Sequence, residues 1–546
     1  MKRILVFTAV VAIIAVSCED RIDLLDSIPP VVTKTEVYQF AEAQTELGNT
    51  IEIPYTIDNL KKALETLPPE TKAAIKEEDF APTHYYVRFA PKDMAELDLL
   101  INLSPRVIWS EVPLDREVIT GGIYYHDPSL PEDRPTYQYS TVSISRWPAL
   151  DTLSVEHEIL LEAFMPDYED VPDTKTSSSE NILSPELESL LRKAYEMAGQ
   201  EYESVGMTKG STWYPSGYIK AYDNFAGIVP ISKVRVRGTH LLKVEETLTT
   251  SSGYFKLVGF KNPVSLKVIW ESDDWDIRYG LVGQATYDGP TLEGAMWNLT
   301  IQSYESGSCH MAAMHRAAHR MYYGYIYNMS RPSYSRKLKM SYMESTLNNG
   351  TTVGLFNPVG VMGSLPDIQV AGYDNVGIRD ITLVFSTTCH ELGHATHYTN
   401  GNLYGSTDDS VRESWARFVQ YLLTIREYTD RNCVSLLFHY NNNGMMIPDD
   451  CYNFQVPNGS TEYTPAFIDL YDNYNQFAYY NYNAPVDVIA GFPPVNIQNV
   501  VFASTSLADA EYELRAYVDN HPNNSYNMTY DTIHDIIGLY YWVPSF

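Results

Sequence analysis

The stretch TCHELGHATHYTNGNLYG, residues 388–405, places His390, Glu391 and His394 within five residues of one another. If this stretch is helical, residues four apart lie on one face, so the imidazoles of His390 and His394 can bind the same metal ion. Glu391 is displaced around the helix, where its carboxylate can reach a metal-bound water without binding the metal. This arrangement is typical of a catalytic metal site and raises the question of the third protein ligand.

The stretch itself does not supply that third ligand. His397 lies seven residues after His390, and a straight helix spreads the three histidine rings over roughly 10 Å, too far for one tetrahedral ion. The longer pattern H-E-x-x-H-x-x-G-x-x-H also fails, because it requires Gly at His397 and His or Asp at Asn400. We therefore expect His397 to support the site or the end of the helix rather than to bind metal.

The next helix offers the missing carboxylate. Residues 379–401 and 410–428 both read as helices, and Gly401 is a natural end for the first. An antiparallel return of the second helix brings Glu413 back over the histidine face. Two histidines and one glutamate leave a fourth position for water, which is the composition of a catalytic rather than a structural site. We expect the metal ligands to be His390, His394 and Glu413.

The spacing H-E-x-x-H-x18-E resembles that of the gluzincin zinc metallopeptidases, and R-E-S-W-A-R-F (412–418) is similar to the N-E-G-F-A stretch around their glutamate ligand. The resemblance implies a Zn²⁺ cofactor, with Glu391 as the general base that activates the zinc-bound water. Two departures stand out. Arg417 takes the place of an Asp found in thermolysin-like members, and the G-x-M-E-N motif of aminopeptidases is absent upstream.

Residues 394–404, HATHYTNGNLY, are similar to the corresponding stretch of thermolysin-like proteases. That resemblance implies that Tyr404 polarises the substrate carbonyl. In related folds a second Tyr or His, several tens of residues beyond the glutamate ligand, shares this role. The sequence leaves open which of five residues it would be here: Tyr474, Tyr479, Tyr480, His439 or Tyr440.

A second pair of histidines, His315 and His319, lies four residues apart in the helical pattern of residues 309–327. The spacing alone would allow metal binding. However, Arg316 and Arg320 flank the pair and no nearby carboxylate completes a ligand set. We expect these two histidines to pack or to form hydrogen bonds in the core.

The N-terminus, MKRILVFTAVVAIIAVSC, combines a positive start with an apolar run too short to cross a membrane. AVSC resembles a bacterial lipobox, which implies that residues 1–17 are a signal peptide and that Cys18 is lipidated. We expect an exported protein, anchored to the cell envelope through Cys18, as in zinc-peptidase-like lipoproteins of Bacteroidetes, which the whole chain resembles. Disulfide pairing among the other cysteines stays open: Cys309, Cys389, Cys433 and Cys451.

Composition narrows the function classes further. The chain has 546 residues, too many for one core, and an apolar fraction of 44% that is typical of globular proteins. Its formal charge of −30 repels phosphate backbones, so we expect no nucleic-acid partner. We expect a monomer that acts on a protein or peptide substrate.

Pattern changes along the chain predict a multidomain α+β fold. Residues 18–50 read as a tether, and residues 51–221 mix helices with strands. Short alternating strands in residues 222–280 predict a small β-sandwich that resembles carboxypeptidase regulatory-like domains. Residues 281–546 are predicted to form a mainly helical, gluzincin-like catalytic domain with a small sheet and a helical C-terminal subdomain.

Three functional hypotheses follow. The first is a zinc metallopeptidase that hydrolyses extracytoplasmic proteins or peptides. The second is a non-catalytic surface lipoprotein that binds a glycan or a protein and carries a vestigial zinc site. The third is a gluzincin directed at glycoproteins such as mucins. Metal content, the effect of replacing Glu391, and a comparison of glycosylated with bare substrates distinguish the three.

Overall fold

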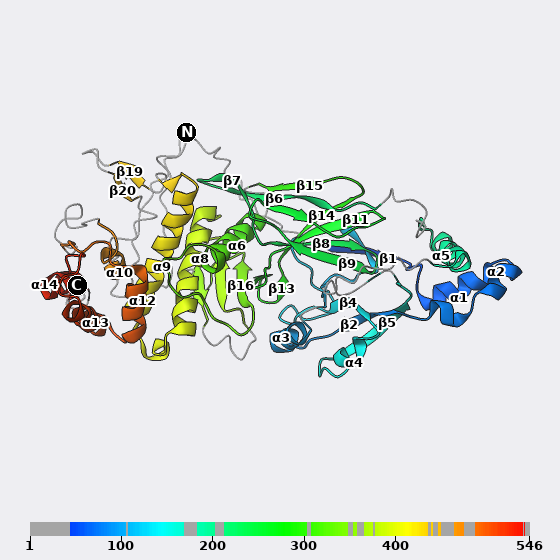
Figure 1. The fold of residues 1–546 in the computed structure, drawn as a ribbon, viewed down its shortest axis with the longest axis horizontal. Helices are drawn as coiled ribbons and strands as arrows, with labels where there is room; N and C mark the ends of the chain where they lie inside the picture. The colour runs from blue at the N-terminus through cyan, green and yellow to red at the C-terminus, as the bar shows by residue number, and fades with distance from the viewer. Residues whose placement is uncertain are drawn as a thin grey trace, which may run out of the picture.

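The computed structural model describes residues 44–104, 107–166, 168, 183–202, 212–302, 307–347, 353–357, 365–374, 377–434, 464–473, 486–538 and 540, and the backbone of 438–440 and 446–448. Its helices and several separate sheets follow one another along an elongated molecule (Figure 1), which confirms the multidomain α+β fold class. Some predicted functional residues lie outside the described side chains, namely Cys18, Cys451, Tyr474, Tyr479, Tyr480, His439 and Tyr440.

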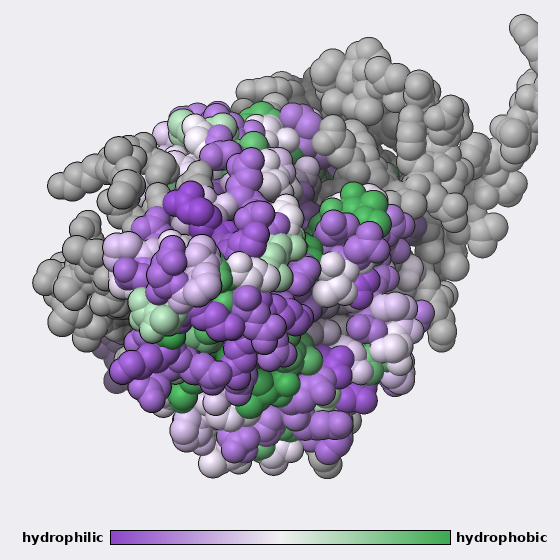
Figure 2. All heavy atoms as spheres, turned by 90° about the vertical axis from the view of Figure 1, so that its right-hand side faces the viewer, coloured by the Kyte–Doolittle hydropathy of each residue, from purple (hydrophilic) through white to green (hydrophobic). Residues whose placement is uncertain are grey.

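The N-terminal part is built around an antiparallel sheet with strand order β4-β2-β5. Helix α1 (Ile57–Thr66) buries Ile57, Leu60 and Ala63 at helical spacing and packs against α5 (Pro185–Met197). The surface of the molecule at this N-terminal end is mostly hydrophilic, with scattered hydrophobic residues (Figure 2). The elements of this part are β1 (Glu46–Thr50), α2 (Pro69–Ala74), η1 (Glu77–Phe80), β2 (His84–Phe89), α3 (Met94–Leu103), β3 (Arg116–Thr120), β4 (Gln138–Ser143), α4 (Trp147–Leu150) and β5 (His157–Ala163).

Two four-stranded sheets form a β-sandwich in the middle of the molecule. One has the order β10-β6-β15, with β7 also paired to β6, and the other has the order β14-β11-β8-β9. Their strands run from Ser216 to Ile301, so they extend beyond the range 222–280 at both ends. The extra strands pair across long stretches of sequence, as β15 does with β6, and local alternation does not reveal such pairing. The strands are β6 (Ser216–Asp223), β7 (Gly227–Pro230), β8 (Arg235–His240), β9 (Lys243–Leu248), β10 (Tyr254–Lys256), β11 (Val264–Ile269), β14 (Thr286–Leu292) and β15 (Trp297–Ile301).

A five-stranded sheet with the order β13-β12-β16-β18-β17 accompanies three long helices. Strands β12, β16 and β18 are parallel, and β17 runs antiparallel to β18 at the edge of the sheet. Helix α8 packs against both α6 and α9. The elements are β12 (Trp275–Tyr279), β13 (Gly283–Gln284), α6 (Ser308–Tyr323), β16 (Leu338–Met343), β17 (Gly354–Phe356), β18 (Ile368–Ala371), α8 (Ile381–Asn400) and α9 (Asp409–Asp430).

A buried charge network joins these helices to the sandwich. The Arg316 guanidinium on α6 contacts the Asp223 carboxylate on β6 at 2.7 Å and the Glu427 carboxylate on α9 at 3.0 Å. All three side chains are buried. Because a buried charge without its partner is costly, this network fixes α6 and α9 relative to β6.

The C-terminal part is helical, as predicted, although its elements are short. Its first helix, α10 (Ala466–Asp469), is a single turn of four residues. No helix in the described ranges combines the length and apolarity that a membrane crossing requires. The remaining elements are η2 (Tyr404–Ser406), β19 (Phe438–Tyr440), β20 (Met446–Pro448), α12 (Pro494–Ala503), α13 (Leu507–Asn520), α14 (Tyr530–Ile533) and the π-helical turn η5 (His534–Gly538).

Candidate metal centre

Helix α8 carries the H-E-x-x-H motif through the interior of the protein. The Asp380 carboxylate caps its first turn by accepting a hydrogen bond from the Thr382 amide at 2.8 Å. His390 and His394 are 3% and 4% exposed, so both imidazoles are removed from bulk water. The four-residue spacing places them one above the other, with their ring centroids 4.9 Å apart.

Helix α9 approaches α8 closely because Gly393 has no side chain. A Cβ atom at Gly393 would lie 2.9 Å from the Ala416 Cα and 3.1 Å from the Val419 Cβ. The Trp415 indole also donates a hydrogen bond to the Gly393 carbonyl at 3.0 Å. This close packing lets a side chain as short as Glu413 reach the two histidines from the first turns of α9.

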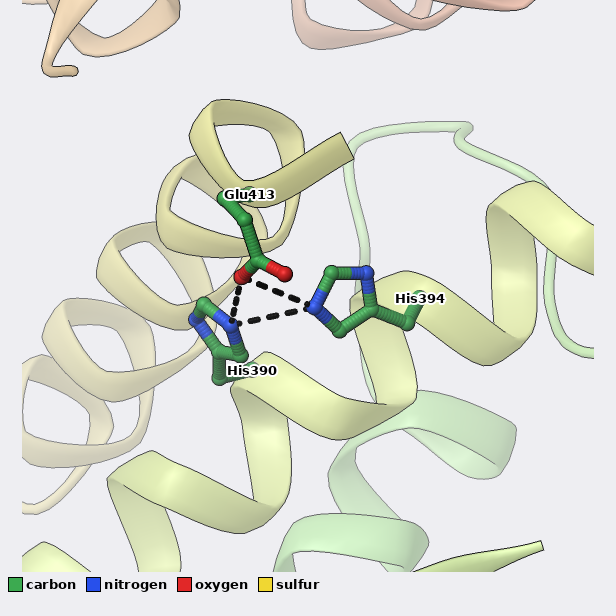
Figure 3. Close-up of side chains that lie close together, drawn as sticks. All are labelled: His390, His394 and Glu413. Atoms are coloured by element: carbon green, nitrogen blue, oxygen red, sulfur yellow. Dashed lines mark hydrogen bonds and ion pairs between the residues drawn. The ribbon is translucent and has the colours of Figure 1, made fainter. Parts of the chain in front are cut away.

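The three predicted ligands meet at one point (Figure 3). The Glu413 Oε2 atom lies 3.1 Å from the Nε2 atoms of both His390 and His394, and these two nitrogens lie 3.2 Å apart. A tetrahedral zinc ion with ligand bonds of about 2.0–2.1 Å separates its ligand atoms by about 3.3–3.4 Å. The observed triangle is close to that spacing, so the group can hold a metal ion.

The protonation of His390 also fits a metal ligand. The Gln420 amide NH₂ donates to the Ser386 hydroxyl at 2.9 Å, which turns the Gln420 carbonyl oxygen toward His390 Nδ1 at 3.2 Å. The Gln420 oxygen can accept the Nδ1 proton of His390, and the Nε2 atom of the same ring is directed at the Glu413 carboxylate. A lone pair facing an anion is repulsive unless a cation or a proton lies between them.

Charge and burial oppose each other at Glu413. Burial favours the neutral acid, but the nearby imidazoles of His394 and His390 and their hydrogen bonds outweigh it, so the pKa of Glu413 lies well below its usual value. Glu413 is thus an anionic ligand at neutral pH. The His394 Nδ1 atom is buried and has no hydrogen-bond partner among the described residues.

Glu391, the predicted general base, lies between α8 and the edge strand β17. It is 1% exposed, and a Cβ atom at Gly354 would lie 2.4 Å from its Oε1 atom. A larger residue at Gly354 would therefore displace this carboxylate. On the same strand, the Phe356 ring stacks on His394 at 6.0 Å and covers one side of the metal triangle.

Tyr404 lies at the margin of the same site, in η2. Its ring contacts Phe356 edge-on at 6.0 Å, and the Arg412 guanidinium lies 5.4 Å above it. Burial raises the pKa of Tyr404; Arg412 lowers it, and the carboxylates of Glu413 and Glu391 raise it further. The hydroxyl is therefore protonated at neutral pH and available as a hydrogen-bond donor near both glutamates.

His397 does not join the metal triangle, in agreement with its spacing. Its ring stacks on Phe502 at 5.0 Å and meets Tyr404 edge-on at 5.0 Å. Burial, followed by the neighbouring His394 and Arg412, lowers the pKa of His397 to about 3, so the ring is neutral. Its role in the described structure is to support the ring of Tyr404.

The residues that surround the proposed ligands were not predicted from the sequence. Gln420 lies seven residues after Glu413, on the same face of α9, so two-turn helical spacing would have identified it. Gly354 and Phe356 carried no signal, because they reach the site only through sheet pairing. Within the described residues, Cys309, Cys389 and Cys433 form no disulfide with one another, and pairing with Cys451 lies outside those residues.

A large cavity of about 1200 Å³ lies away from the metal group, between the N-terminal part, the sandwich and the loop at residues 330–337. Neither the three ligands nor Glu391 line it. Most of its charged side chains are paired with one another, for example Arg235 with Glu246 at 3.3 Å and Arg278 with Glu111 at 3.1 Å. The chemistry of the metal group, rather than cavity size, identifies the candidate site.

Comparison with known proteins does not assign the chain to a family. No family model matches the sequence, and no curated protein matches it. Among solved structures, a 9R-lipoxygenase from Cyanothece PCC8801 matches with a TM-score of 0.11 and 12% identity, over 24% of this chain and 26% of that chain. This likeness is too slight to carry an argument, so the assignment of function rests on the site itself.

Proposed function

We propose that this protein is a zinc-dependent metallopeptidase of the gluzincin type. The observation that carries the proposal is the convergence of His390 Nε2, His394 Nε2 and Glu413 Oε2 within 3.2 Å of one another, with Glu391 next to them in the sequence. Two imidazoles and one carboxylate are ligands that suit zinc and leave room for a water molecule.

A zinc ion held by these three residues would supply a water of lowered pKa and polarise a carbonyl group. Glu391 accepts the proton of the attacking water and returns it to the leaving nitrogen as the amide bond breaks. The protonated hydroxyl of Tyr404 donates a hydrogen bond to the oxyanion that develops on the carbonyl oxygen. Gln420 holds His390 in the tautomer that offers Nε2 to the metal.

The position of β17 at the edge of its sheet favours a peptide as the substrate. Among the described strands it pairs only with β18, through residues Gly354–Phe356. The backbone groups on its other side can therefore pair with an extended polypeptide. Because Gly354 lies against Glu391, a chain bound there would pass beside the proposed general base.

The proposed setting is outside the cytoplasm. The leader and the lipobox-like AVSC favour an exported protein held at the cell envelope by a lipid on Cys18. The substrates would then be proteins or peptides met there by a monomeric enzyme. Mass spectrometry of the membrane-extracted protein tests the lipid, which should be lost in Cys18→Ala.

The decisive experiment for the peptidase proposal is Glu391→Gln. This substitution keeps the shape of the side chain but removes its basicity, so hydrolysis of a peptide library should fall about 10²–10⁴-fold. Metal analysis of the same variant should still find one zinc per chain. If the wild type binds zinc but cleaves no member of bare or glycosylated libraries, the protein is a binding lipoprotein with a vestigial site.

The range of substrates is tested with the same two libraries. Cleavage of bare peptides supports a general peptidase. Cleavage confined to glycosylated peptides supports the alternative, a gluzincin directed at mucin-like glycoproteins. Activity that Glu391→Gln leaves unchanged would contradict both and would exclude this glutamate from the chemistry.

A further inference from the structure

The outward face of the sandwich sheet β10-β6-β15, with β7, is a separate surface at the upper edge of the molecule in Figure 1. Along β6, Ile219 and Ala221 are buried and turn inward, whereas the alternate residues Tyr218 and Lys220 turn outward. The register places Tyr254 of β10 beside Tyr218. We call this surface the tyrosine–lysine face; its outward residues are Tyr214, Tyr218, Lys220, Ile228, Tyr254, Lys256, Val258, Met296, Asn298 and Thr300.

The tyrosine–lysine face differs in charge from the rest of this acidic chain. The protein has 69 acidic residues and a formal charge of −30. Yet the segments that build this sheet, 212–231, 249–263 and 294–302, hold a single acidic residue, Asp223, which is fully buried and paired with Arg316. Among the outward residues named above, the formal charges are therefore those of Lys220 and Lys256, and the exposed Glu293 lies just outside these segments, three residues before Met296.

The two lysines of this face lie against tyrosine rings. The Lys256 Nζ atom lies 4.7 Å from the centre of the Tyr214 ring, and the Lys220 Nζ atom lies 5.7 Å from that of Tyr218. Neither lysine forms an ion pair with any residue in the described ranges. Their charges are thus held at the surface by cation–π contacts and are free to meet an anionic partner.

Large apolar side chains project between these charges. Met296 and Tyr214 are each 52% exposed, Val258 is 48% exposed and Ile228 is 46% exposed. They lie at the ends of the strands, around the lysines and tyrosines. A surface with exposed apolar groups, tyrosines and unpaired lysines offers contacts to both the charged and the hydrocarbon parts of a partner.

We propose that the tyrosine–lysine face docks on the surface of an anionic lipid bilayer. Tyrosine is favoured at the membrane interface, where its ring is apolar and its hydroxyl is hydrated, and each lysine near an anionic leaflet contributes about 1 kcal/mol. The negative charge elsewhere on the protein does not prevent docking, because a Debye length of about 8 Å at physiological salt screens it. The inference is independent of the metal site and of the lipid on Cys18.

Binding to vesicles tests this proposal. A chain that begins at Glu19 retains every described residue and lacks the proposed lipid anchor. At about physiological salt it should sediment with vesicles of phosphatidylglycerol and phosphatidylcholine, bind phosphatidylcholine alone much more weakly, and detach as the salt concentration is raised further. Lys220→Gln/Lys256→Gln should weaken the binding about 20- to 30-fold, at about fivefold for each lysine. Lys61→Gln/Lys62→Gln removes the same charge from exposed positions on α1 and should bind like the parent chain.

The apolar part of the face is tested by Ile228→Ser/Met296→Ser, which should also reduce vesicle binding while near-ultraviolet circular dichroism stays unchanged. Equal binding by the parent chain and both face variants would overturn the proposal. So would an absence of binding to anionic vesicles. Binding of the face to neutral oligosaccharides but not to vesicles would assign it to glycans instead, and would equally exclude the lipid surface.

Discussion

Helices α6 and α8 each carry two histidines four residues apart, yet they use them in opposite ways. In α6, the His315 Nδ1 atom accepts a hydrogen bond from the Trp275 indole at 3.1 Å, and its Nε2 atom donates one to the Ser232 carbonyl at 2.9 Å. Both ring nitrogens are therefore occupied. In α8, the Nε2 atoms of His390 and His394 instead converge on a carboxylate from the next helix.

The comparison shows that spacing brings two imidazoles together but does not make a metal site. A site also needs a free lone pair on each ring and a third ligand within reach. In α6 the neighbouring charges are Arg316 and Arg320, whose partner Glu427 is already shared between them. In α8 the neighbour is Glu413, which bonds only toward the two histidines in the contacts described above.

The largest expected difference between the two helices is in metal content. His394→Ala removes one of the three proposed ligands and should abolish the proposed binding of one zinc per chain, together with any peptidase activity. His319→Ala changes the equivalent second histidine of α6 and should leave the zinc content at one per chain. Elemental analysis of the two purified variants makes the comparison. Loss of zinc in both would mean that α6 also contributes to metal binding.

The next effect concerns Gln420, which orients His390. Gln420→Leu removes the acceptor of the His390 Nδ1 proton, so zinc affinity should fall about 10- to 100-fold. Competition with a chelator of known affinity measures this change. The matched control is Gln498→Leu: Gln498 is also buried and hydrogen-bonded, but its partner is Ser330. That variant should lose stability without losing zinc affinity.

A smaller effect is expected at the contact between α8 and α9. Gly393→Ala places a methyl group 2.9 Å from the Ala416 Cα atom, so the helices must separate, at a cost of about 1–3 kcal/mol in the free energy of unfolding. Because Glu413 moves with α9, zinc affinity should fall as well. Gly405→Ala is the control, since a Cβ atom there meets nothing within 4 Å. Chemical denaturation and zinc titration of both variants check the prediction; equal behaviour would contradict it.

Much of the metal group could be predicted because its geometry is local. Helical spacing fixes His390 relative to His394, and a short turn between two helices fixes the return of Glu413. The approach of α9 depends on Gly393, a residue inside the motif itself. The absence of a ligand role for His397 followed from the same spacing. The fold class was predicted from periodicity, which is also a local property.

The rest depends on contacts between residues far apart in the sequence. Gly354 reaches Glu391 only because β17 pairs with β18, and Asp223 reaches Arg316 only because helix α6 packs on strand β6. The alternation that defined the range 222–280 could not show that β6 and β15 belong to one sheet. Likewise, the flanking arginines predicted that His315 would pack or form hydrogen bonds, but its partners Trp275 and Ser232 could not be identified from the sequence.

The last prediction concerns His315, whose two ring nitrogens are both hydrogen-bonded. Its expected effect is on the stability of the fold alone. Burial lowers the pKa of His315 to about 3, against an ordinary value of about 6.5. The folded protein therefore keeps His315 neutral at pH 5, while the unfolded chain binds a proton there. The stability contributed by neutral His315 is fully present above about pH 6.5 and is lost as pH falls from there toward 3.

His315→Gln keeps a donor and an acceptor for Trp275 and Ser232 but removes the titration. Between pH 7 and 5, the wild type should lose about 2 kcal/mol more unfolding free energy than the variant does. Chemical denaturation at pH 5, 6 and 7 measures this difference, with a chelator present so that release of zinc does not contribute. Parallel pH curves would mean that His315 takes up a proton in the folded state, and that its two hydrogen bonds do not hold it neutral. The same substitution should leave zinc affinity unchanged, because the His315 ring has no nitrogen left for a metal.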